Sequence, residues 1–177
     1  TYFIADIGSN HDGSLERAQN LCTLAKESGS DAVKFQHFKA KTIVSKHGYQ
    51  NLSSNESHQS SWKKSIYEVY EEAATPFDWS PHLKKHCDDI GIDFFTTPYD
   101  LDYVDSLDPF VSIYKIGSGD ITWSQMLHKI GSKKKPIILS TGAATLDEIT
   151  KAVDIVSSYE VPLTLLQCNT NYTGKEE

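Results

Sequence analysis

The chain alternates short apolar runs with stretches of helical periodicity, and this alternation limits the folds open to it more than any other feature. Residues 2–7 are mostly apolar, residues 8–13 are rich in turn formers, and from Ser14 to Gly29 apolar positions recur at helical spacing. The same order repeats along the chain. Further strands are predicted at 31–36, 94–97, 112–116, 136–140 and 163–167, with helices at 62–74, 83–90, 101–107, 123–130 and after a capping box at Thr145.

Strands separated by single helices indicate a parallel sheet, because parallel neighbours need a crossover of about a helix's length. No two-residue hairpin signal lies between the predicted strands. We therefore expect an α/β fold. Two architectures meet this pattern, a doubly wound open sheet and a (β/α)8 TIM barrel.

The composition fits one globular domain and excludes several classes of function. The 177 residues carry 17 Lys and Arg against 24 Asp and Glu, a net charge of −7. Because a nucleic-acid surface needs clustered cations, we expect no nucleic-acid partner. No apolar run reaches the length of a membrane span, so we expect no membrane partner.

The cysteines and histidines show no metal or disulfide spacing. Cys22, Cys87 and Cys168 are far apart, no Cys-x-x-Cys occurs, and no two of the seven histidines form His-x-x-x-His. We therefore expect no metal ligands within these residues and a reducing, cytoplasmic location. Cys168 has no basic neighbour in the sequence, so we assign it no nucleophilic role.

The polar segment 45–61 interrupts the alternation. It is rich in Ser, Asn, His, Gln and Lys and has almost no apolar residues. We expect a surface insertion, although long loops in compact domains also serve as lids or binding loops.

Polar residues end nearly every predicted strand. Ligands bind at the carboxyl ends of parallel strands, so these residues are the candidates for a functional site. The candidates are Asp6, Lys34, Gln36, Thr97, Lys115, Ser118, Asp120, Ser140 and Thr170. Lysines, hydroxyls and glycine-flanked amides are the components of a phosphate cradle, and the carboxylates could transfer protons or bind a metal ion.

The same residues allow other interpretations. A structural salt bridge would explain Lys34 and Lys115 inside apolar strands, and backbone amides could satisfy Asp6. The Gly-Ser-Gly around Ser118 is also a common tight turn. A Schiff-base aldolase with Lys34 or Lys115 as the amine, another phosphate-binding barrel enzyme, and an inactive binding fragment are the functional alternatives.

Six motifs in order resemble the successive signatures of the sialic acid synthases. They are IADIGSNHDG at 4–13, DAVKFQ at 31–36, TTPYD at 96–100, YKIGSGD at 114–120, ILSTG at 138–142 and LQCNTNY at 166–172. Together they span nearly the whole chain. The resemblance implies an incomplete TIM barrel, with about six of the eight βα units present, as the N-terminal part of a catalytic domain.

The resemblance also implies a reaction. Family members condense phosphoenolpyruvate with an N-acetylmannosamine-type sugar, giving a nine-carbon 2-keto sugar acid and phosphate. C3 of phosphoenolpyruvate attacks the sugar aldehyde, which a divalent metal polarises; water captures the cation at C2, and the tetrahedral intermediate expels phosphate.

Matching positions carry the family's roles onto this chain. The implied ligands of the phosphate are Thr97, Lys115, Ser118, Ser140 and Thr170. Lys34 would bind the carboxylate of phosphoenolpyruvate, and Asp120 would be the acid/base that manages the proton of the attacking water.

The sugar side of the site departs in part from the family's pattern. Gln36 and Tyr172 would face the sugar, and Asp6, where many members have Glu, would lie near the sugar hydroxyls or a metal-bound water. The sixth-strand motif usually begins His-Cys-Thr, whereas this chain has Gln-Cys-Asn at 167–169, which makes Thr170 the least secure assignment.

The resemblance finally implies parts outside residues 1–177. It implies Mn2+ or Mg2+ with ligands beyond Glu177, the rest of the barrel, a C-terminal domain that covers the sugar, and a homodimer of the full-length enzyme. We therefore expect exposed apolar edges at the first and sixth strands.

Overall fold

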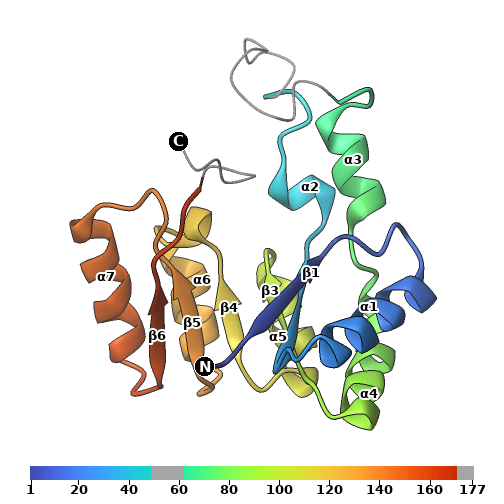
Figure 1. Cartoon of the computed structure of the whole chain (residues 1–177). Helices are drawn as coiled ribbons and strands as arrows, with labels where there is room; N and C mark the ends of the chain where they lie inside the picture. The colour runs from blue at the N-terminus through green and yellow to red at the C-terminus, as the bar shows by residue number, and fades with distance from the viewer. Residues whose placement is uncertain (49–61, 171–177) are drawn as a thin grey trace. The chain divides into compact units, whose positions relative to one another are not determined.

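The computed structural model describes residues 1–48 and 62–170, so most of the segment 45–61, and Tyr172, lie outside the described residues. The chain divides into two compact units, Thr1–Phe94 and Phe95–Glu177. In each, helices alternate with strands, and six strands are present in the described residues (Figure 1). The predicted α/β class is therefore confirmed.

The N-terminal unit begins with a β-α-β segment. Its elements are β1 (Ile4–Gly8), α1 (Leu15–Glu27), β2 (Ala32–His37), α2 (Ala40–Ile43), α3 (Ile66–Ala73), the 3-10 helix η3 (Phe77–Trp79) and α4 (Ser80–Ile90). β1 and β2 are parallel, and α1 contacts both strands as well as α4. Ala18 and Cys22 of α1 and Leu83 and Cys87 of α4 are fully buried.

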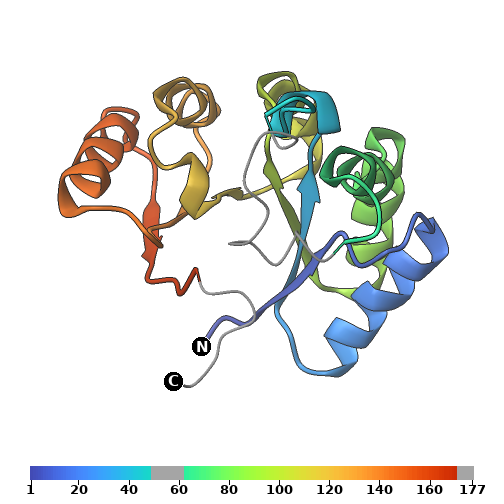
Figure 2. The same cartoon turned by 90° about the horizontal axis from the view of Figure 1, so that it is seen from above.

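The C-terminal unit continues the pattern. Its elements are β3 (Asp93–Pro98), which begins just before the boundary, α5 (Leu101–Leu107), the 3-10 helix η4 (Asp108–Phe110), β4 (Tyr114–Ile116), the 3-10 helix η5 (Ser118–Asp120), α6 (Ser124–Gly131), β5 (Ile137–Ser140), α7 (Leu146–Ser157) and β6 (Leu163–Leu166). The strands are parallel in the order β3–β4–β5–β6. Helices α6 and α7 contact one another and lie on the same side of these strands (Figure 2).

Local sequence signals place most helix ends. Ser14 caps α1 by accepting from the Arg17 N–H, and Gly91 ends α4 in the left-handed conformation at φ +70°. The capping box of α7 forms as predicted, with Thr145 and Glu148 each bonding the other's backbone N–H.

Three predicted details are wrong. The helix predicted from 62 begins at Ile66, because Ser65 and Glu68 form a second capping box. The helix predicted from 83 begins at Ser80, with Pro81 in its first turn, where a missing N–H costs nothing. The sequence pattern did not predict α2, whose four residues are too few for a periodic signal.

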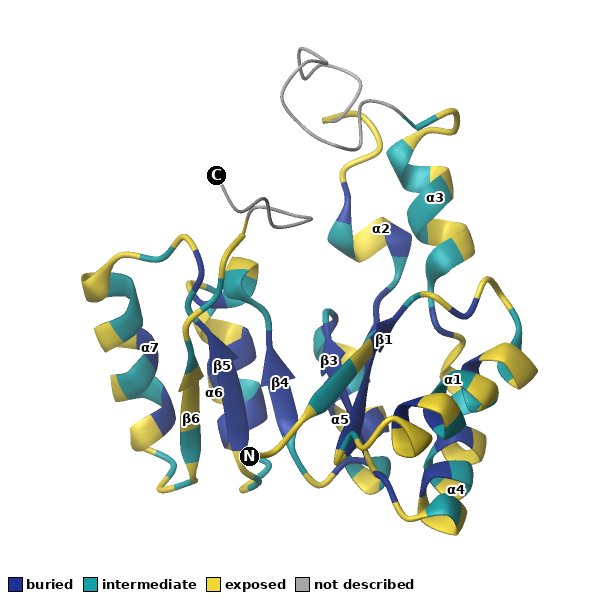
Figure 3. Cartoon of the chain, viewed as in Figure 1, coloured by how far each residue is buried: buried dark blue, intermediate teal, exposed yellow. Residues whose placement is uncertain are grey.

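Apolar residues are exposed at both edge strands, as expected. Phe3, just before β1, is 60% exposed, and Leu165 of β6 is 44% exposed. Figure 3 shows the contrast in the C-terminal unit, where β5 is buried throughout and β6 is not. None of the helices in residues 1–48 and 62–170 is long and apolar enough to cross a bilayer.

Candidate functional site

A β-bulge sets the carboxyl end of β1. Asp6 pairs with Lys34 of β2, but the register then shifts so that Gly8, rather than Ile7, pairs with Phe35. Gly8 has φ +55°, a left-handed conformation that glycine adopts without strain. The chain therefore turns into the loop 9–13 directly after it has presented Asp6.

Asp6 and Lys34 form an ion pair at this end of the sheet. Lys34 Nζ donates to Asp6 Oδ1 at 2.8 Å, and the side chains are 11% and 56% exposed, respectively. The salt bridge considered for Lys34 is therefore observed. Because the carboxylate lies on the solvent side of the ammonium, an incoming carboxylate could replace it at the same cation.

Gln36 lies near the ion pair of Asp6 and Lys34. A Cβ built on Gly8 would lie 3.5 Å from Asp6 Oδ1 and 3.8 Å from Gln36 Cδ, so both side chains lie next to the bulge. We call Asp6, Lys34 and Gln36 the N-terminal cluster. It combines one cation, one carboxylate and one amide.

In the C-terminal unit, Lys115 of β4 meets Ser140 of β5. Lys115 pairs with Ile138, and Ser140 follows two residues later, so both side chains project from the same face of the sheet. Lys115 Nζ donates to Ser140 Oγ at 2.5 Å and to the Ile116 carbonyl at 2.8 Å, and both side chains belong to buried residues. Polar neighbours thus hold the ammonium in one position.

Ser118 and Gly142 continue this arrangement. The Gly142 N–H donates to Ser118 Oγ at 3.0 Å. A Cβ built on Gly142 would lie 2.6 Å from Thr170 Cγ2 and 3.0 Å from Ser118 Oγ, so a larger residue would displace one of them. Glycine at 142 therefore brings the predicted residues Ser118 and Thr170 close together.

Asp120, at the end of η5, has an altered acidity. Burial raises the pKa of Asp120 to about 6, and the positive charge of Lys115 opposes that rise. A carboxyl group with a pKa near neutrality can both accept and release a proton under physiological conditions. We call Lys115, Ser118, Asp120 and Ser140 the C-terminal cluster.

Thr97 lies buried on the strand next to the C-terminal cluster. Thr96 pairs with Tyr114, which places Thr97 level with Lys115 on the adjacent strand. The structure thus brings predicted residues together within each unit, and Tyr172 lies outside its described residues.

Two buried histidines lie next to the N-terminal cluster along the chain, and the sequence analysis assigned neither of them to the site. His37 follows Gln36 directly and is fully buried, with its Nε2 3.1 Å from Ser80 Oγ. His11 caps the loop after β1, because the Gly13 N–H donates to its Nδ1 at 3.1 Å. The available signal for His37 was a third polar residue at the end of β2, after Lys34 and Gln36.

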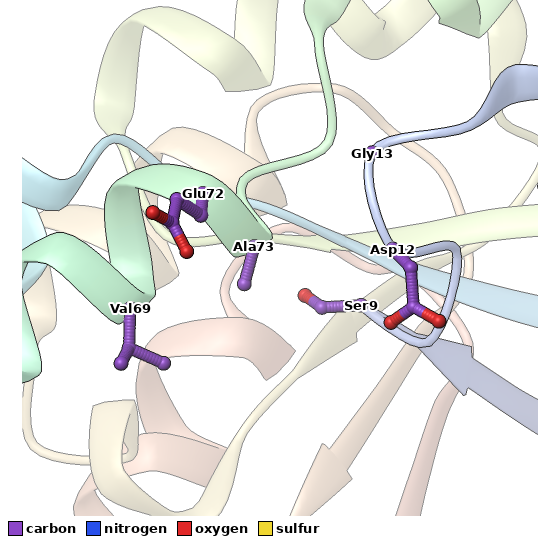
Figure 4. A pocket seen from close by; sticks show the side chains of 6 residues that line it. All are labelled: Ser9, Asp12, Gly13, Val69, Glu72 and Ala73. Atoms are coloured by element: carbon purple, nitrogen blue, oxygen red, sulfur yellow. The ribbon is translucent and has the colours of Figure 1, made fainter. Parts of the chain in front are cut away.

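A hollow of about 520 Å3 lies elsewhere in the N-terminal unit. The loop after β1 and α3 line it with Ser9, Asp12, Gly13, Val69, Glu72 and Ala73 (Figure 4). Its two carboxylates already have cationic partners, Arg17 for Asp12 and Lys64 for Glu72. It contains none of the predicted site residues.

The resemblance implies a divalent metal, and the described residues form no site that could hold one. Within residues 1–48 and 62–170, no three His, Cys, Asp or Glu side chains are grouped so that they could hold a metal ion. Asp6, the carboxylate that the resemblance puts near the sugar hydroxyls or a metal-bound water, forms an ion pair with Lys34. These residues therefore do not make a metal site by themselves.

Several known proteins are similar to this chain in sequence. The model of the NeuB family matches residues 21–177. The chain is 37% identical to the N,N'-diacetyllegionaminic acid synthase of Campylobacter jejuni subsp. jejuni serotype O:2, over 97% of this chain and 52% of that protein. It is 29% identical to the N-acetylneuraminate-9-phosphate synthase of Homo sapiens, over 99% of this chain and 48% of that protein. The chain thus spans about half the length of these curated relatives.

Solved structures share the fold. A crystal structure of N-acetylneuraminic acid (sialic acid) synthetase from Leptospira borgpetersenii serovar Hardjo-bovis, in complex with citrate, matches with a TM-score of 0.86 and 27% identity, covering 99% of this chain and 56% of that one. A truncated 3-deoxy-D-arabino-heptulosonate 7-phosphate synthase from Thermotoga maritima matches with a TM-score of 0.67 at 15% identity, which shows a related fold alone.

Proposed function

The chain belongs to the NeuB family, whose named members include sialic, legionaminic and pseudaminic acid synthases, and from this membership we propose that it is the N-terminal part of such a synthase's catalytic domain. The proposed reaction condenses phosphoenolpyruvate with an N-acetylmannosamine-type sugar and releases phosphate. A barrel of eight βα units, completed by further parts of the same protein, belongs to this proposal.

The observation that carries the proposal is the C-terminal cluster. An ammonium, two hydroxyls and the backbone at Gly142 are grouped at the carboxyl ends of β4 and β5. Cationic and hydroxyl donors of this kind bind phosphate oxygens. In this proposal Lys115, Ser118 and Ser140 hold the phosphate of phosphoenolpyruvate, with Thr97 and Thr170 as further donors.

The N-terminal cluster has a separate proposed role. Lys34 binds the substrate carboxylate, which takes the place that Asp6 occupies in the free chain at 2.8 Å. Once displaced, the Asp6 carboxylate is free to accept hydrogen bonds from sugar hydroxyls. Gln36 and Tyr172 face the sugar in the same proposal.

Asp120 is the proposed acid/base. When C3 of the enolpyruvate attacks the sugar aldehyde, C2 becomes electron-poor and takes up a water molecule. Asp120 accepts one proton of that water, and the aldehyde oxygen takes up a proton in turn. The tetrahedral centre then expels phosphate, which leaves with the second proton as the C2 hydroxyl becomes the ketone. The pKa of about 6 means that most Asp120 side chains are ionised, and able to act as the base, at neutral pH.

Mn2+ or Mg2+, if bound in the complete protein, would polarise the sugar aldehyde. Because the described residues do not form a metal site, the proposal assigns none of them as ligands. Metal ligands beyond Glu177 stay a prediction from the family resemblance.

The Schiff-base aldolase is the second candidate. It needs an unprotonated, accessible lysine amine. Lys34 instead forms an ion pair with Asp6, and Lys115 donates to two oxygens, which favours anion binding by both. Borohydride trapping of a lysine adduct with the substrate would decide for the aldolase.

Calorimetry with phosphoenolpyruvate tests the proposal on the 177-residue chain. Lys115→Met should weaken binding at least about tenfold, because it removes a charged phosphate donor. The matched control is Lys129→Met in the same unit, which breaks an exposed ion pair with Asp105. Equal affinity in the two variants would refute the phosphate site. Phosphate release by the complete protein that carries this chain, in the presence of the sugar, tests the reaction itself.

A further inference from the structure

Four polar side chains of the N-terminal unit are buried in or against the segments that follow the N-terminal cluster along the chain. His11, His37 and Ser80 are fully buried, and Thr75 is 1% exposed. Their contacts join three segments: the loop after β1, the end of β2, and the connection from α3 to α4. Buried polar groups need partners, so the geometry of these contacts constrains how the segments meet.

His11 ties the loop after β1 to this connection. Its Nδ1 accepts from the Gly13 N–H at 3.1 Å, so its proton resides on Nε2, which donates to Thr75 Oγ1 at 3.1 Å. The ring also meets Trp79 edge-on, with 5.2 Å between ring centroids. The His11 imidazole thus bonds to Gly13 within its own loop and to Thr75 in the connection from α3 to α4.

His37 ties the end of β2 to the same connection. It follows Gln36 directly, and its Nε2 lies 3.1 Å from Ser80 Oγ, at the start of α4. Burial, together with a smaller effect of the nearby His11, lowers the pKa of His37 to about 3. Burial lowers the pKa of His11 as well, against the opposing charge of Asp12, so both rings stay neutral near pH 7.

The two segments fixed in this way carry the N-terminal cluster. Asp6 and Gly8 lead into the loop that His11 holds, and Lys34 and Gln36 precede His37 on β2. Neither imidazole has exposed surface, so neither can touch a substrate.

We propose that His11 and His37 are positioning residues, which fix the loop after β1 and the end of β2 to one connection and so hold Asp6, Lys34 and Gln36 in their binding geometry. This inference rests on the proposed function, because that function gives the N-terminal cluster its role. Hydrogen bonds depend on direction, so they restrict the positions of the two segments more than apolar contacts would. Buried polar networks in which every group has a partner are rigid for this reason.

The test compares three variants of the 177-residue chain. His37→Leu removes the bond to Ser80, His37→Gln keeps a polar atom near the position of Nε2, and His86→Leu is the matched control. His86 Nε2 lies 3.0 Å from Thr23 Oγ1, a similar bond in the same unit that joins α1 and α4 instead. Urea unfolding of each variant records its effect on global stability.

Phosphoenolpyruvate affinity, measured by calorimetry, is the first measurement. His37→Leu should bind about tenfold more weakly than wild type, whereas His37→Gln and His86→Leu should stay within about threefold. An unchanged affinity in His37→Leu, or an equal loss in His86→Leu, would overturn the proposal. If the wild-type chain does not bind, the proposed function fails instead.

Amide hydrogen exchange is the second measurement and needs no ligand. His37→Leu should speed exchange in residues 8–13 and 34–37 about tenfold, whereas His86→Leu should leave these amides unchanged. If His37→Leu does not fold, Thr75→Val replaces it, because it removes one hydroxyl at constant volume and should speed exchange of the Gly13 N–H. Exchange at the wild-type rate in both segments would contradict a positioning role.

Discussion

The altered acidity of Asp120 predicts that Asp120→Asn stabilises the fold at neutral pH. Burial holds the Asp120 pKa at about 6 instead of 3.8, so ionising this carboxyl group costs more in the folded chain than in the unfolded one. An amide of the same shape does not ionise. The substitution should therefore remove a penalty that the wild-type chain carries.

The size of the effect follows from the pKa. A pKa unit corresponds to about 1.4 kcal/mol, so the rise from 3.8 to about 6 sets a ceiling of about 3 kcal/mol. Because Asp120 is only partly buried, solvent screening reduces this to about 1 to 2 kcal/mol. Below pH 3.8 the group is protonated in both states and the penalty vanishes. It grows between pH 3.8 and 6, as the unfolded chain loses its proton first, and is constant above.

Urea unfolding of the 177-residue chain at pH 3.5 and pH 7.5 measures the effect. Asp120→Asn should raise the free energy of unfolding by about 1 to 2 kcal/mol at pH 7.5 and leave it nearly unchanged at pH 3.5. Asp154→Asn on the exposed face of α7 is the control, with no expected gain at either pH. An Asn variant no more stable than wild type at pH 7.5 would refute the assigned acidity.

Three further outcomes are expected. In the complete protein, Asp120→Asn should abolish phosphate release yet keep phosphoenolpyruvate affinity, and an equal loss of both would make Asp120 structural. Gly142→Ala should weaken phosphoenolpyruvate binding measured by calorimetry, because its Cβ would lie 3.0 Å from Ser118 Oγ; wild-type affinity would show that the surroundings adapt. Thr145→Ala should lower the urea-derived stability by about 1 kcal/mol through loss of the α7 cap, and a change below about 0.3 kcal/mol would contradict this.

The order of strands and helices could be predicted because each signal is local. Periodicity, the Thr145 capping box and the left-handed Gly91 all act within a few residues. The start at Ile66 was misplaced because its cap, Ser65, lies among polar residues that carry no periodic signal. The start at Ser80 was misplaced because no side-chain cap marks it.

The candidate residues could be chosen from the sequence, because ligands bind at the carboxyl ends of parallel strands and polar residues end these strands; their roles stay predictions. Their partners could not. From the sequence, Lys34 and Lys115 could each form a salt bridge or bind a substrate. In the structure Lys34 pairs with Asp6, and Lys115 donates to Ser140.

The sequence by itself determined the α/β class, the strand order along the chain and the residue types at the strand ends. Only the tertiary structure decided which of these residues meet: Asp6 with Lys34, just before the bulge at Gly8, and His37 with Ser80. The physical reason is that a helix or strand signal depends on neighbours a few residues away. A side-chain contact between remote residues depends instead on strand register, and a one-residue bulge changes which side chains face each other.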